Sequence, residues 1–165
     1  MIYADARGDI RSGDLLAFSH GDWKSISGIK TNIIRIFTRS EYSHVAIAWV
    51  IGGRVFALEA VKPKLRIFPL SKLGDFYYVR IGARWTDFTE EYALSKIGID
   101  YSELAAIRAF FRPLEDENVQ ECAAYVLEVL EKDDVDLGYM ARPDSVVQAA
   151  LKRGVLTFVE NGGNK

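Results

Sequence analysis

The chain has 165 residues, 49% of them hydrophobic, which is enough for one domain with a core of its own but too few for two. Its 21 basic and 23 acidic side chains leave a formal net charge of -2, which excludes a global field that would attract nucleic acid or an anionic membrane. Residues 1–11 are too charged for a signal peptide and no later apolar stretch could span a bilayer, so we expect a single cytoplasmic domain over residues 1–165 whose partners are recognised in a local pocket.

The first half of the chain alternates short apolar runs with turn residues, a pattern typical of sequential β-strands. Gly52 and Gly53 separate two of these runs, so we expect a β-hairpin there. The apolar residues of Ile29–Thr38 mostly follow helical spacing and predict a short amphipathic helix between the strands. The predicted strands are Leu15–Phe18, His44–Val50, Arg54–Ala60, Leu65–Pro69 and Phe76–Ile81.

The second half of the chain has helical patterns instead. Pro113 ends one helix, Asp144 directly after Pro143 is a start signal, and Gly154 is a stop signal. The predicted helices are Phe88–Ile97, Tyr101–Phe111, Val119–Glu131 and Pro143–Lys152. Strands followed by helices indicate an α+β fold, in which an antiparallel sheet packs against helices.

The single cysteine, Cys122, excludes an internal disulfide and any paired-cysteine redox or zinc motif. It lies near the start of a predicted helix, where unpaired backbone amides and the helix dipole favour a thiolate and can bind an oxyanion. A lone cysteine on an apolar helix face, here with Tyr125 and Val126, is more often a structural core residue. Its position alone therefore makes Cys122 a candidate nucleophile and no more.

Two histidines, His20 and His44, are the available bases for such a nucleophile. His44 begins a predicted strand, a rigid setting that suits a fixed catalytic imidazole and a hydrogen-bonded core histidine equally well. His20 lies in a loop, where we expect at most a rim contact to substrate. Glu59 ends the strand paired with that of His44 and could orient the imidazole, although most glutamates at strand ends face water.

Patterns for other kinds of site are absent from the sequence. It contains no nucleophile elbow, phosphate-binding loop or zinc-protease motif, and the acidic cluster at residues 133–136 lacks the spacing of a calcium loop. We therefore expect no metal and no cofactor.

Six short segments follow one another in a recognisable order. They are Gly13-Asp14-Leu15-Leu16, Tyr42-Ser43-His44-Val45-Ala46-Ile47, Leu58-Glu59-Ala60, Gly98-Ile99-Asp100-Tyr101-Ser102, Glu121-Cys122-Ala123-Ala124-Tyr125-Val126 and Arg142-Pro143-Asp144-Ser145. Together they resemble the circularly permuted, NlpC-type papain-like hydrolases, the YiiX-like group related to lecithin retinol acyltransferase. The resemblance covers most of the chain. Ala123 departs from it, because many relatives carry serine after the cysteine.

The resemblance implies a permuted papain-like fold, since His44 precedes Cys122 in the chain, and a covalent mechanism. Cys122 would attack an amide or ester carbonyl, His44 would carry the proton, and Glu59 would orient His44. Tyr101 would line the substrate pocket, although a core tyrosine fits its pattern too. The implied substrate is a peptide, a cell-wall peptide or an amino-acid amide.

Two other functions remain open at this point. The same fold could serve an acyltransferase or lipid thioesterase, for which we would expect a membrane anchor or a large apolar surface. It could also be a non-catalytic binding module, although the candidate cysteine, histidine and glutamate are all present. The family points to a bacterial or bacteriophage source, and action on cell walls would then require export, lysis or delivery within a virion.

Overall fold

The computed structural model describes residues 1–19, 42–101 and 121–162. Within these ranges the strands form one antiparallel sheet in the order β4-β3-β2-β1-β5-β6. The strands are β1 (Leu15–Ser19), β2 (Tyr42–Ile51), β3 (Arg54–Val61), β4 (Lys64–Pro69), β5 (Phe76–Val79) and β6 (Leu156–Val159). The helices are α1 (Tyr3–Ala6), the short 3-10 helix η2 (Leu70–Lys72), α3 (Asp87–Ser95), α5 (Glu121–Glu131) and α6 (Pro143–Ala150).

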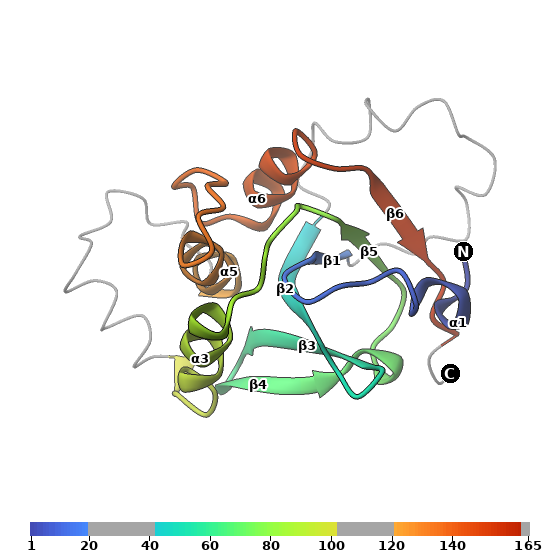
Figure 1. The fold of residues 1–165 in the computed structure, drawn as a ribbon, viewed down its shortest axis with the longest axis horizontal. Helices are drawn as coiled ribbons and strands as arrows, with labels where there is room; N and C mark the ends of the chain where they lie inside the picture. The colour runs from blue at the N-terminus through green and yellow to red at the C-terminus, as the bar shows by residue number, and fades with distance from the viewer. Residues whose placement is uncertain (20–41, 102–120, 163–165) are drawn as a thin grey trace.

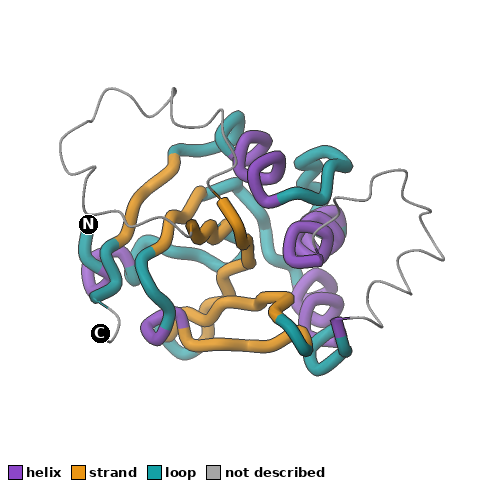
Figure 2. The backbone as a smooth tube through the Cα atoms, turned by 180° about the vertical axis from the view of Figure 1, so that it is seen from behind, coloured by secondary structure: helices purple, strands orange, loops and turns teal. Residues whose placement is uncertain are grey.

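The sheet has an apolar core on each face. Helices α3, α5 and α6 lie together along one side of the strands, and α1 lies at the far end beside β6 (Figure 1). The view from behind shows the same separation of helices and strands (Figure 2). Consecutive strand residues point to opposite faces, so Leu15 packs toward α5 and α6 while Leu16 packs toward α1 and η2. This explains why β1 is an unbroken apolar run in the sequence.

The prediction of an α+β fold with an antiparallel sheet is confirmed, as is the hairpin at Gly52 and Gly53, which joins β2 to β3. The helix predicted at residues 29–38, and all but the first residue of the one predicted at 101–111, lie outside the described residues. No helix among the described residues is long and apolar enough to cross a bilayer.

β6 is not predicted by the sequence pattern; it returns after the helices to pair with β5 along Phe76–Val79. Gly154 precedes β6, and a side chain at this position would place its Cβ 2.1 Å from the backbone carbonyl oxygen of Arg80. Glycine is therefore required for the close approach of the chain to the end of β5, in addition to stopping α6. The strand itself is too short and too weakly alternating to be recognised from its own residues.

Both ends of the described chain meet at β6. The backbone N–H of Tyr3 donates to the carbonyl of Glu160 over 3.0 Å, and the N–H of Glu160 donates to the carbonyl of Met1 over 2.8 Å. Residues near the start of the chain are thus hydrogen-bonded to residues that directly follow the last strand.

Asp133, in the turn after α5, anchors the segment that leads into α3. Its buried carboxylate accepts hydrogen bonds from the backbone N–H groups of Arg84, Trp85 and Thr86 and from the Thr89 hydroxyl. Burial alone would raise the pKa of Asp133, but these bonds outweigh it and hold the pKa below its ordinary value. The acidic cluster at 133–136 therefore supplies a structural anion that joins two helices.

Candidate functional site

The candidate site lies at the point along β2 where its ladder with β3 ends while its ladder with β1 continues. On one side β2 pairs with β1 from Ile47 back to Tyr42, and on the other it pairs with β3 from Ile51 to Ile47. The β2–β3 ladder ends at Leu58, which faces Ile47, while β3 continues to pair with β4 along its other edge as far as Val61. The backbones of β2 and β3 thus separate at this point, and side chains occupy the space between them.

His44 lies on β2 just after a bulge. The β1–β2 ladder steps from Phe18 opposite His44 to Ser19 opposite Tyr42, which leaves Ser43 as an extra residue in β2. Such bulges bend a strand and redirect the neighbouring side chains, and they are common beside active sites. The imidazole of His44 packs against the Phe18 ring, with 5.6 Å between the ring centroids.

His44 and Glu59 bridge the two separated strands. The imidazole Nε2 lies 2.8 Å from the Glu59 Oε2, while the Glu59 side chain is 2% exposed and that of His44 is 21% exposed. Glu59 is the first residue of β3 beyond its ladder with β2, so its carboxylate reaches across the gap. The glutamate at the strand end therefore faces the interior of the protein and not water.

Cys122 approaches His44 from the helical side. It is buried in the first turn of α5, followed by the small buried residues Ala123 and Ala124. Its side chain lies close enough to His44 to contribute to the raised pKa of the imidazole. Because Nε2 of the imidazole faces Glu59, Nδ1 is the ring nitrogen left for the sulfur. The three side chains thus form a chain of thiol, imidazole and carboxylate.

The charges of this cluster stabilise one another. Burial lowers the pKa of His44, but its hydrogen-bonding and electrostatic interactions with Cys122 and Glu59 outweigh burial and raise that pKa to about 9. Burial raises the pKa of Glu59, but His44 and Arg66 outweigh it and hold that pKa below its ordinary value. The arrangement therefore favours an imidazolium next to an ionised carboxylate at neutral pH.

Arg66 on β4 was not singled out from the sequence. It is the cross-strand partner of Glu59, and its Nε and Nη2 lie 2.8 and 2.7 Å from Glu59 Oε1. The two carboxylate oxygens are thus divided between Arg66 and His44. The available signal was the spacing of residues 59 and 66 around the β3–β4 turn, but the register that makes them partners is not visible in the sequence.

Of the two other residues predicted to contact substrate, the structure describes Tyr101 but not His20. Tyr101 lies beside the β3–β4 turn, where its backbone N–H donates to the Pro63 carbonyl over 2.8 Å and its ring faces the Lys62 ammonium at 5.7 Å. A role for Tyr101 in a substrate pocket stays a prediction. His20 lies outside the described residues.

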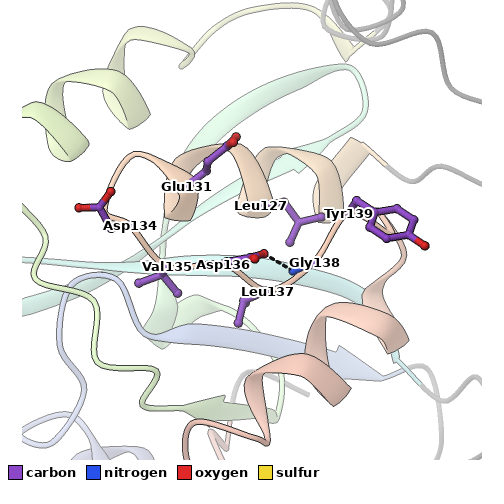
Figure 3. A pocket seen from close by; sticks show the side chains of 8 residues that line it. All are labelled: Leu127, Glu131, Asp134, Val135, Asp136, Leu137, Gly138 and Tyr139. Carbon is purple, nitrogen blue, oxygen red and sulfur yellow. Dashed lines mark hydrogen bonds between the residues drawn. The ribbon is translucent and has the colours of Figure 1, made fainter.

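A pocket of about 500 Å³ lies away from this cluster (Figure 3). It is lined by the second half of α5 and the loop that follows, through Leu127, Glu131, Asp134, Val135, Asp136, Leu137, Gly138 and Tyr139. None of the three residues of the thiol, imidazole and carboxylate chain lines it. The chemistry of the side chains, and not the size of a cavity, therefore identifies the candidate site.

Comparisons with known proteins give information on the fold but not on the chemistry of the site. No family model and no curated protein matches the chain. The crystal structure of the metalloprotein YiiX from Escherichia coli O157:H7 (DUF1105) is similar, with a TM-score of 0.50 and 19% sequence identity over 91% of this chain and 88% of that one. This similarity supports a YiiX-like fold.

YiiX is a metalloprotein, so the described part of this chain was compared with the requirements of a metal site. Across the described ranges, no group of three or more histidine, cysteine, aspartate or glutamate side chains is arranged to hold a metal ion. The side chains of His44 and Glu59, which could ligate a metal, are already hydrogen-bonded to each other, and Glu59 also accepts from Arg66. The described side chains therefore do not fit a metal ion.

Proposed function

We propose that this chain is a cysteine hydrolase of the permuted, NlpC-type papain-like kind, which cleaves an amide bond in a peptide, a cell-wall peptide or an amino-acid amide. The observation that supports this most directly is that Cys122 lies next to an imidazole, that of His44, which is itself hydrogen-bonded to the buried carboxylate of Glu59. A nucleophile, its base and a group that orients the base are what acyl transfer through a covalent intermediate requires.

The buried charges also favour catalysis over a purely structural role. Burying a carboxylate and an imidazolium carries a desolvation cost of several kcal/mol per ion, which a core of apolar side chains would avoid. A structural cysteine packed against Tyr125 and Val126 needs neither His44 nor Glu59 beside it. The cluster is easier to explain if its charges serve a reaction.

In the proposed reaction the thiolate of Cys122 attacks the carbonyl carbon while the backbone N–H of Cys122 stabilises the oxyanion. The carbon–nitrogen bond then breaks, and the imidazolium of His44 gives its proton to the leaving nitrogen. A thioester of Cys122 remains. Neutral His44 next takes a proton from water, whose oxygen attacks the thioester, and the released acid leaves a thiolate and an imidazolium again. Glu59 stays ionised throughout and holds the imidazole in place.

The test is a search by intact-protein mass spectrometry for acyl adducts after incubation with amide, ester and thioester libraries. Because the chain has one cysteine, a thiol adduct can be assigned to Cys122 and must vanish in Cys122→Ala. We expect transient acylation that decays in water, and slower acylation in His44→Ala. Adducts that decay only when an alcohol or amine acceptor is added would indicate an acyltransferase instead. A complete absence of adducts across the libraries, with Cys122 inert to small alkylating agents, would contradict the proposal.

A further inference from the structure

We infer that Arg66 is a positioning residue of this site, which fixes the carboxylate of Glu59 and supplies its permanent counter-charge while His44 gains and loses its proton. The inference rests on the proposed function. It concerns a residue that does not touch the thiol and acts through Glu59.

The geometry fixes the orientation of the carboxylate. Two nitrogens of Arg66 bind the single oxygen Oε1 of Glu59, so Oε2 is left to face His44. Without Arg66, no other described residue would donate to Oε1, and the carboxylate could rotate to share either oxygen with the imidazole. Rotation of the carboxylate would also release the imidazole from its orientation toward Cys122.

Arg66 is itself held in place. Its guanidinium stacks on the Phe68 ring, 4.4 Å from the ring centroid, and it shares a rung of the β3–β4 ladder with Glu59. Its side chain is 43% exposed, so its charge is solvated on one side and its desolvation cost is small. A partly solvated, stacked arginine next to a buried carboxylate combines rigidity with a low cost of burial.

Arg66 also supplies a charge that does not change during the reaction cycle. His44 is a cation only until it protonates the leaving group, and it then becomes neutral beside a carboxylate that is 2% exposed. If His44 were the only counter-charge, Glu59 would be an isolated buried anion at that moment and would tend to take up a proton. Arginine stays charged throughout, so Arg66 keeps Glu59 an acceptor and keeps the proton of neutral His44 on Nε2.

The experiment uses the full chain and reads Glu59 directly. The variants are Arg66→Met, which removes charge and donors, Arg66→Lys, which keeps the charge, and Arg84→Met as the control. Arg84 makes a comparable ion pair, 2.7 Å from Asp134 to Nη2, but both partners are exposed and neither of them shifts the pKa of Glu59. In each variant the carboxyl carbon of Glu59 is followed by NMR across a pH series, with Glu59→Gln providing the assignment.

We expect the Glu59 titration to move to higher pH in Arg66→Met, to return most of the way in Arg66→Lys, and to stay unchanged in Arg84→Met. The rate of iodoacetamide labelling of Cys122 at pH 7 should fall roughly tenfold or more in Arg66→Met, because both charge-assisted contacts to Oε1 are lost. Circular dichroism confirms that each variant is folded.

The outcomes separate this inference from the proposed function. If wild-type Cys122 is reactive and needs His44, but Arg66→Met leaves both the Glu59 titration and the labelling rate unchanged, the role of Arg66 is refuted and the hydrolase proposal stands. If wild-type labelling is independent of His44 while Arg66→Met still shifts Glu59, the ion pair is present but serves no nucleophile, and it is the proposed function that fails.

Discussion

Glu59→Gln should lower the pKa of His44 and misorient its imidazole without removing a side chain from the core. The pKa of His44 is raised from 6.5 to about 9, which corresponds to roughly 3 kcal/mol of net stabilisation of the imidazolium. Burial opposes this, so the combined attraction of Cys122 and Glu59 must exceed that figure. Glutamine has the size of glutamate but no charge, and its amide N–H₂ can face Nε2 as a donor. His44 would then carry its proton on Nδ1, toward Cys122, and could not accept the thiol proton there.

The assay is a pH titration of both imidazoles by proton–nitrogen NMR, with His44→Gln identifying the signals. We expect the His44 midpoint to fall from about 9 to near or below 6.5 in Glu59→Gln. Turnover of any substrate found by acyl trapping should fall on the order of a thousandfold or more, as it does when an orienting carboxylate is made neutral in other triads. An unchanged His44 midpoint in Glu59→Gln would refute the charge coupling on which the site is built.

Three further changes test the site and the fold. Cys122 should react quickly with iodoacetamide below pH 7 in the native protein and more slowly in His44→Ala; if it is inert until denaturant is added, the hydrolase proposal fails. Asp133→Asn should lower the free energy of unfolding by about 2 kcal/mol in urea denaturation at pH 7. Because the pKa of folded Asp133 lies below 3.8, this difference should shrink in acid, and a difference independent of pH would contradict the carboxylate role. In thermal melts, Gly154→Ala should destabilise the fold by about 1–3 kcal/mol, because its Cβ would clash with the Arg80 carbonyl. Gly74→Ala is the control and should be nearly neutral, because there is open space around Gly74.

The sequence predicts those parts of the fold whose pattern lies within one segment. The strands of the first half each have their own apolar run, and the glycines at 52 and 53 mark the hairpin. The strand β6 could not be predicted in this way, because it depends on the open edge of β5, which lies some 80 positions earlier in the chain. Its residues are compatible with a strand but do not require one.

The candidate site was predictable by residue type and not by geometry. A single cysteine, two histidines and a glutamate on a paired strand limit the choices to a few residues. The separation of β2 from β3 at Ile47, which brings His44 and Glu59 together, depends on which strands pair on each side of β2. Arg66 and Asp133 were missed for the same reason, since each acts on a partner chosen by tertiary contacts.

Hydrogen bonds of Glu160 with Met1 and Tyr3 hold the first residues beside those that follow β6. The same arrangement in space could therefore be encoded by a gene with a different order of residues. A linker of a few residues could join these ends, and the chain could be opened between β5 and α3 without breaking any pair of the sheet. In such a rearranged gene Cys122 would be translated before His44, yet the same strands would pair. Recombination of the gene can thus reverse the order in which Cys122 and His44 are synthesised, and the folded protein stays the same.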